Sequence, residues 1–269
     1  MSLLSTDRLH VSLEPESLAV CRVRGVFRKT LISKAVVECD PQYGRLPWEG
    51  ALEALKQSIG ALGRERLKTS VVLSNRLVRY ALVPSDAAAS GPQEELALAR
   101  FHFTRIYGER AKTWDLRLSE GAAGSARIAS AIDQGLVEGL RACFALPEGP
   151  RLVSVQPYLA AAFNGWRGSN NGKEPAWLVL HERERACFAL ASREGWHSVQ
   201  SVRVATAGDL LPLLEREGLR AGNAVRTATI HGATPEAGPG WTLSPPRLPP
   251  LEGFSPLDDS RDTMALCAA

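Results

Sequence analysis

The chain has 269 residues, of which 45% are hydrophobic and 23% charged, an ordinary balance for a folded globular protein. Its formal net charge of +3 is small for this length, and no run of Lys and Arg marks a nucleic-acid groove or an anionic membrane surface. No stretch approaches the roughly 20 apolar residues of a membrane-spanning helix. We therefore expect a cytoplasmic protein, large enough for two lobes, that binds no nucleic acid and does not insert into a membrane.

The cysteines and histidines suggest neither a metal site nor redox chemistry. The five cysteines form no CxxC pair, and four of them stand inside apolar runs, which favours reduced thiols in a hydrophobic core. The five histidines are scattered along the chain. We expect no metal and no catalytic residue.

The first 75 residues follow a strand-strand-strand-helix-strand pattern. Two segments alternate apolar and polar residues at period two and flank a short turn that contains Pro15. A third strand follows, then a helix for which Gly63 is the expected stop, then a short apolar run that fits a buried strand parallel to the first. The expected elements are strands at 8–13, 17–24, 30–39 and 69–74, with a helix from 48 to 62.

The next segment, about residues 75–132, is expected to be an insertion into this pattern. It contains a strand that ends at Pro84, an amphipathic helix that ends at Gly108, and two strands separated by a glycine-containing loop. These few elements cannot bury their apolar faces alone, so we expect a small α+β subdomain packed on the first lobe. The elements are strands at 77–83, 113–119 and 126–132 and a helix at 94–108.

A helix at 136–144, a strand at 151–155 and a helix from Pro157 complete the first lobe, residues 1–167. Residues 168–175 have the composition of a linker. The pattern then restarts in a shorter second lobe, residues 176–244, in which Asp209 is the expected helix cap. Its elements are strands at 177–180, 186–191, 199–204, 225–230 and 241–243 and a helix at 209–217. From Pro245 to residue 269 the chain is rich in proline and loses periodicity, which predicts an extended or disordered tail.

The two turns that would cradle phosphate in such a duplicated fold lack the residues for that role. The first reads Leu13-Glu-Pro-Glu16 and the second His181-Glu-Arg-Glu184. Neither offers a glycine for close backbone approach or an aspartate for a metal. Their carboxylates would repel phosphate by roughly 4 kcal/mol per contact before screening. Nucleotide binding at these turns is not expected.

Two passages resemble the PilM group of proteins, which includes the cytoplasmic domain of the type II secretion L protein and the pilus protein MshI. Residues 71–84 (VVLSNRLVRYALVP) are similar to the strand that leads into that family's inserted subdomain. Residues 151–163 (RLVSVQPYLAAAF) are similar to its strand-Pro-helix passage. The resemblance covers roughly residues 7–232. It implies an α/β, actin-like fold of two RNase H-like lobes, with an inserted α+β subdomain in the first.

The chain departs from this family where nucleotide chemistry would lie. Nucleotide-binding members carry Asp-x-Gly in the first hairpin, where this chain has Ser12 and Glu14. The second hairpin should repeat Asp-x-Gly, and here His181 and Glu182 occupy the turn. A late Gly-Gly turn near the adenosine is reduced to the single Gly232. The resemblance therefore implies a degenerate nucleotide cleft without a cofactor.

The resemblance also implies a function. Members of this group are soluble parts of the inner-membrane assembly platform of type IV pili or a related secretion machine, and they bind the short cytoplasmic tail of a bitopic membrane protein. We expect such a tail to lie in a groove between the first lobe and the insertion, lined by Leu77, Tyr80 and Leu82. Self-association is a second expected interaction. The alternative is a divergent actin-fold ATPase or sugar kinase.

Overall fold

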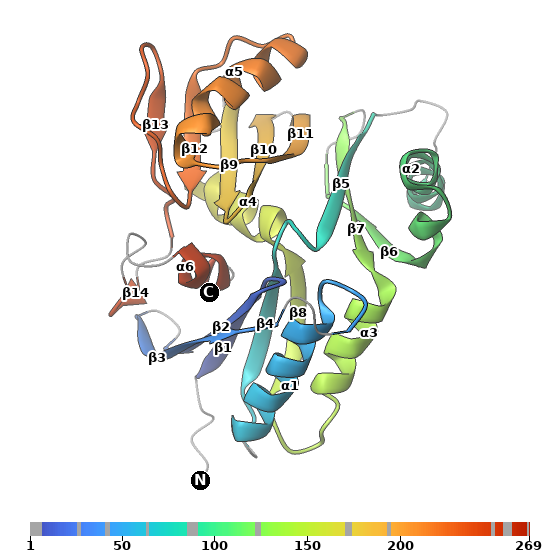
Figure 1. Ribbon diagram of the computed structural model, residues 1–269, viewed down its shortest axis with the longest axis vertical. Helices are drawn as coiled ribbons and strands as arrows, with labels where there is room; N and C mark the ends of the chain where they lie inside the picture. The colour runs from blue at the N-terminus through green and yellow to red at the C-terminus, as the bar shows by residue number, and fades with distance from the viewer. Residues whose placement is uncertain are drawn as a thin grey trace. The chain divides into compact units, whose positions relative to one another are not determined.

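The computed structural model describes residues 7–25, 28–40, 44–62, 65–84, 91–121, 125–169, 174–192, 195–248, 251–254, 260–267 and 269. The chain forms two compact units, each assembled from separate stretches of sequence (Figure 1). The first unit comprises residues 1–77, 135–165 and 247–269. The second comprises residues 78–134 and 166–246. Gly63 and half of the expected linker, residues 170–173, fall outside the described residues.

The first unit contains a six-stranded mixed sheet in the order β14-β3-β2-β1-β4-β8. β1, β2 and β3 form an antiparallel meander, and β4 joins β1 in parallel, as the apolar run at 69–74 predicts. β1 is buried along nearly its whole length because β2 and β4 flank it on both sides. The strands are β1 (Arg8–Leu13), β2 (Ser17–Arg24), β3 (Lys29–Glu38), β4 (Lys68–Leu73), β8 (Arg151–Pro157) and β14 (Leu251–Glu252).

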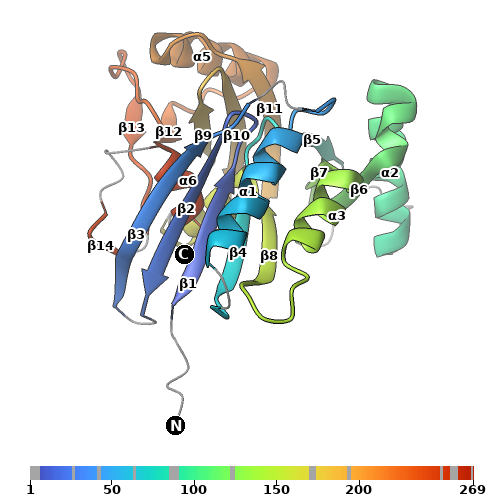
Figure 2. The same ribbon diagram turned by 60° about the horizontal axis from the view of Figure 1, so that its bottom comes forward.

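Helices cover both faces of this sheet. α1 (Glu49–Leu62) and α3 (Gln134–Cys143) lie on one face, and α6 (Ser260–Leu266) lies on the other (Figure 2). α1 buries Ala51, Leu55 and Ile59, which are spaced at the helical period. α4 (Tyr158–Ser169) begins in this unit. It ends at residue 169 and so includes the first two residues of the segment 168–175 that was expected to be a linker.

The C-terminal segment is folded, so the prediction of an extended or disordered tail is wrong for residues 251–254 and 260–267. β14 pairs in parallel with the start of β3, and α6 packs on β1, β2 and β4. Ala265 and Leu266 join Cys21 and Val23 in a buried apolar cluster. The carboxylate of Asp262, 1% exposed, meets Lys34 Nζ at 2.9 Å. A seven-residue helix is too short to show a clear period, which is why the sequence pattern did not reveal it.

The inserted segment forms a sheet of its own in the second unit, with the order β5-β7-β6. α2 covers one face, where Phe103 packs against Leu116 and Ala129. The insertion differs from the expectation in one respect: it belongs to the same compact unit as the second lobe, and its strands β5 and β7 contact β11. The elements are β5 (Val78–Val83), α2 (Pro92–Tyr107), η1 (Gly108–Thr113), β6 (Trp114–Leu118) and β7 (Arg127–Asp133).

The rest of the second unit repeats the pattern of the first. Its five-stranded sheet has the order β11-β10-β9-β12-β13, with β9 to β11 antiparallel and β12 parallel to β9. Trp177, Phe188 and Leu214 are fully buried in its core. Asp209 is the N-cap residue of α5, as expected, and its carboxylate accepts a hydrogen bond at 2.9 Å from the backbone N–H of Thr206, which is the N-cap of η2. The elements are β9 (Ala176–Glu182), β10 (Arg185–Ser192), β11 (Gly195–Arg203), η2 (Ala207–Asp209), α5 (Leu210–Arg220), β12 (Thr227–His231) and β13 (Thr242–Ser244).

Candidate functional site

The turn between β1 and β2 is closed by its own hydrogen bonds. The backbone N–H of Glu14 donates to the carbonyl of Ser17 at 2.9 Å, and the Ser17 hydroxyl donates to the Glu14 carboxylate at 3.4 Å. Pro15 has no N–H to offer. A phosphate-binding turn points its backbone N–H groups at the ligand. In this turn the donors of Glu14 and Ser17 bind acceptors within the turn itself. Glu14 is also largely buried, with 7% of its surface exposed.

An arginine from the end of β4 neutralises the second acid of the same turn. Arg76 Nη2 lies 2.6 Å from Glu16 Oε1, and Nη1 pairs with Oε2, which gives a two-point contact. The backbone N–H of Arg76 is fixed by the Ser74 hydroxyl at 3.1 Å. The repulsion expected from the Glu16 charge is therefore largely compensated by Arg76. The Glu14 N–H and the Ser17 hydroxyl are thus already used within the turn.

Ser12 is buried in the sheet just before this turn, with 1% of its surface exposed. It pairs with Ala19 on β2 and with Val72 on β4. The next strand ends tightly against it, since Ser74 N–H donates to the carbonyl of Leu13 at 3.0 Å. Ser12 is therefore buried between β2 and β4 at the end of β1, with almost no access to solvent.

The corresponding turn in the second unit, between β9 and β10, is held against the residues that follow β12. Gly232 has a φ of +94°, and a Cβ built on it would lie 2.3 Å from the carbonyl oxygen of His181. His181 Nδ1 lies 3.2 Å from the carbonyl oxygen of Ala233. Glycine is required here because any side chain would collide with the β9 backbone. Gly232 thus serves close packing of protein on protein.

The charged groups near this second turn are of both signs, with Arg183 and Arg185 beside Glu182 and Glu184. Glu182 is buried, with 8% of its surface exposed, and Glu184 pairs with Arg203 at 3.3 Å. Burial lowers the pKa of His231 to about 4, so this histidine is neutral at pH 7. Burial also raises the pKa of the Cys187 thiol, and the Glu182 charge adds to the effect. The buried carboxylate, the neutral imidazole and the neutral thiol supply no positive charge, so the cations of this turn are Arg183 and Arg185.

The three residues predicted to bind a partner do not share one environment. Leu77 is 8% exposed and lies in the turn of the first unit that precedes β5. Tyr80 and Leu82 are half-buried on β5, opposite Ser130 and Ile128 of β7. They occupy the face of this sheet that points away from α2, since Ala81 and Val83 pack towards the helix. Tyr80 and Leu82 are thus brought together, whereas Leu77 offers little surface to a partner.

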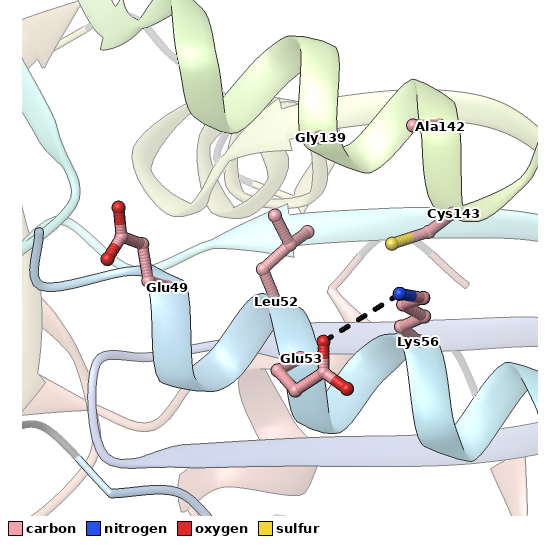
Figure 3. A pocket seen from close by; sticks show the side chains of 7 residues that line it. All are labelled: Glu49, Leu52, Glu53, Lys56, Gly139, Ala142 and Cys143. Carbon is pink, nitrogen blue, oxygen red and sulfur yellow. Dashed lines mark ion pairs between the residues drawn. The ribbon is translucent and has the colours of Figure 1, made fainter. Parts of the chain in front are cut away.

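The first unit also contains a pocket of about 360 Å³ between α1 and α3 (Figure 3). Gly139 lines this pocket and lets the two helices approach closely, since a Cβ on Gly139 would lie 2.4 Å from the Leu52 side chain. Lys56 faces Glu53 across 4.0 Å, and the Cys143 thiol points towards Lys56. Burial raises the pKa of that thiol, which keeps it protonated. Sequence reasoning gave no sign of this pocket, because its residues come from helices that are far apart in the chain.

Within the described ranges, no group of three or more His, Cys, Asp or Glu side chains could hold a metal ion. No described helix is both long and apolar enough to cross a membrane.

The architecture defines the class of the protein. The orders β3-β2-β1-β4 and β11-β10-β9-β12 are the same arrangement built twice, each with its fourth strand parallel to the first. Together with a subdomain inserted after β4, this is the two-lobed actin-like fold. No family profile matches the chain, and no curated protein matches it.

Solved structures with this fold match most of the chain. A chain of the PilM–PilN type IV pilus biogenesis complex is 17% identical, with a TM-score of 0.61, and the match covers 88% of this chain and 87% of that one. The cytoplasmic domain of EpsL, an inner-membrane component of the type II secretion system of Vibrio cholerae, is 12% identical, with a TM-score of 0.59 and coverage of 97% and 94%. A Bacteroides thetaiotaomicron protein with an actin-like ATPase fold and unknown function is 9% identical, with a TM-score of 0.60 and coverage of 86% and 84%. At these identities the likeness establishes the fold alone. The actin-like fold is confirmed, and the PilM and L-protein group named from residues 71–84 and 151–163 is found among the structural neighbours.

Proposed function

We propose that this protein is a non-catalytic adaptor in the inner-membrane assembly platform of a type IV pilus or a type II secretion-like machine. It acts on the cytoplasmic face and is held there by a partner. The likeness to EpsL and to the PilM–PilN complex supports the platform role.

One observation carries the non-catalytic part of the proposal. The turn where an actin-like ATPase would bind phosphate is closed by the Glu14–Ser17 bonds and the Arg76–Glu16 pair. To bind a triphosphate, the turn would have to lose several hydrogen bonds, and it would still lack a carboxylate placed for magnesium. The second turn supports the same conclusion, because Gly232 packs on the protein backbone.

Titration calorimetry with ATP and magnesium tests this part. We expect no saturable heat in the micromolar range, either for the native protein or for Arg76→Ala, in which Glu16 is released. Saturable binding by the native protein would contradict the proposal and would favour a divergent ATPase. Repeating the titration in the presence of a sugar tests the alternative that the protein is a sugar kinase.

The proposed partner is the short cytoplasmic tail of a bitopic inner-membrane protein. It would contact the surface of β5 that carries Tyr80 and Leu82, through apolar contacts and strand addition at the edge of the β5-β7-β6 sheet. β5 is an edge strand of that sheet, and it also contacts β11, so an added strand would have to fit beside β11.

A pull-down from detergent-solubilised membranes tests the partner. We expect recovery of a membrane protein that persists at high salt, because apolar contacts and backbone bonds are screened little. Tyr80→Ala should reduce the recovery, whereas Leu219→Ala, which truncates an apolar side chain that is 83% exposed on α5, should not. Recovery that disappears at moderate salt, or that both variants reduce equally, would count against docking on β5.

A further inference from the structure

The last two turns of α2 carry an unusual concentration of exposed apolar side chains. Phe101 is 60% exposed, Ile106 64% and Tyr107 37%. Single exposed apolar residues are common on soluble proteins. Here three of the eight large apolar side chains that are exposed in the described residues fall within seven positions of one helix. α2 packs Ala99 and Phe103 into the core of the insertion, and Tyr107, one turn after Phe103, contacts the rings of Phe103 and Trp114.

The same stretch carries the net charge of the whole chain. Residues 100–112 contain four cations and one acid, a net charge of +3, and the entire sequence has a net charge of +3. The remaining residues are therefore neutral in sum. The acid, Glu109, pairs with Lys112 at 2.9 Å. The cations are Arg100, Arg105, Arg110 and Lys112.

These arginines are available to a ligand. Arg105 and Arg110 are exposed and form no salt bridge among the described contacts. Arg100, also exposed, donates to the backbone carbonyl of Ala111 at 3.5 Å and keeps its charge uncompensated. Positive charge and exposed apolar surface thus coincide at one end of α2, which Figure 1 places at the rim of the second unit.

We propose that this α2–η1 surface, formed by Arg100, Phe101, Arg105, Ile106, Tyr107 and Arg110, binds the surface of an anionic phospholipid bilayer. Guanidinium groups pair with lipid phosphates through two N–H donors, while aromatic and aliphatic side chains enter the head-group layer. The long arginine stems add apolar contact below the charged ends. The contact is peripheral and involves no spanning segment.

The directions of the side chains favour a bilayer over a protein groove. Phe101 and Ile106 are five positions apart and point about 140° from each other around the helix axis. A helix that docks in a groove presents a stripe of residues three and four apart. Phe101 and Arg105, four positions apart, share the side of α2 that points away from Phe103, whereas Ile106 and Tyr107 project from the helix end nearer to Phe103, so the exposed side chains form no single stripe for a groove. The sequence showed no basic run because the arginines are spaced five residues apart.

Flotation of the full chain with protein-free vesicles tests this proposal. We expect binding to mixed vesicles of phosphatidylglycerol and phosphatidylcholine, and none to phosphatidylcholine alone. The double variant Arg105→Gln/Arg110→Gln should bind about 30-fold more weakly, since each cation near an anionic surface contributes about fivefold. Phe101→Ala should weaken binding roughly tenfold, through the lost apolar insertion. The affinity of the native chain should fall as salt increases.

Matched control variants test whether vesicle binding depends on the α2–η1 surface or only on the overall charge and apolar surface of the protein. Arg66→Gln/Arg151→Gln removes the same charge from two exposed cations of the first unit, and Leu219→Ala removes an exposed apolar side chain elsewhere. Neither should weaken vesicle binding by more than about twofold. An equal loss in the control double variant, or absence of vesicle binding at low salt, would overturn the proposal. Recovery of an acidic protein in an Arg105- and Arg110-dependent manner, without vesicle binding, would also overturn it. The vesicles contain no protein, so the result is independent of the partner proposed for β5.

Discussion

Gly232→Ala should destabilise the protein by about 2–5 kcal/mol. The φ of +94° at this position costs an L-residue about 1–2 kcal/mol. The new Cβ would lie 2.3 Å from the His181 carbonyl oxygen, so the backbones of β9 and the β12 end must separate by about 1 Å. Forced separation of packed groups costs typically about 1–3 kcal/mol. The contact between His181 Nδ1 and the Ala233 carbonyl, now 3.2 Å, would lengthen as well.

Gly222→Ala is the matched control. Gly222 also has a positive φ, +62°, but a Cβ there would meet nothing within 4 Å. This variant should lose about 1 kcal/mol from its backbone conformation alone. The difference between the two variants isolates the steric term.

Urea unfolding, followed by circular dichroism, measures both variants. We expect a clearly lower midpoint for Gly232→Ala than for Gly222→Ala, with the same slope against urea concentration. Equal midpoints would refute the reasoning that Gly232 is required for close approach to His181. The function of this glycine would then have to be sought in ligand contact.

Three further predictions concern charges. Asp262→Ala removes the buried partner of Lys34 and should lower the free energy of unfolding by about 2 kcal/mol. Hydrogen exchange should become faster in α6 and change little in the second unit. Unchanged exchange in α6 would contradict the idea that this pair docks the helix. Arg76→Ala should lower the free energy of unfolding by about 1–2 kcal/mol, because it leaves the half-buried Glu16 carboxylate without this ion pair. Arg76→Lys keeps the charge and should lose less stability. Equal losses in the two variants would indicate that Arg76 acts through packing and not through its charge. Burial, and to a smaller extent two nearby cations, lowers the pKa of His10 from 6.5 to about 4. The contribution of neutral His10 to stability is therefore complete above pH 6.5 and is lost as the pH falls towards 4. The urea midpoint should fall over this pH window, and His10→Gln should make that fall smaller.

The strands and helices could be predicted from the sequence because their burial is one-sided and regular. β2 alternates buried and half-buried residues, and the expected range 17–24 coincides with Ser17–Arg24. α1 buries residues four apart, and the expected range 48–62 begins one residue early. Local periodicity is sufficient for elements of this kind.

What the sequence could not predict depends on contacts between distant residues. α6 is stable because Asp262 and Leu266 meet Cys21 and Lys34, which lie more than 220 residues earlier in the chain. The packing of the insertion on β11 is decided in the same way.

The two candidate turns were also only partly predictable from the sequence. The absence of Asp-x-Gly at Ser12 and Glu14 could be read directly from the sequence. The compensation of Glu16 by Arg76, 60 residues away, could not. The role of Gly232 also required the structure, because its constraint comes from His181, which is distant in sequence.

The C-terminal segment has a consequence for the way the protein is made. The first unit needs residues 1–77, 135–165 and 247–269, so the chain passes from one unit to the other four times. A ribosome releases the N-terminal strands first, and the helix that covers Cys21 and Val23 emerges only after residues 260–266 have been made. Until then the nascent first unit must keep that face of its sheet uncovered, at risk of association with other chains. A chain that stops before residue 260 would keep this exposure permanently, and we expect it to be the form that chaperones and proteases recognise.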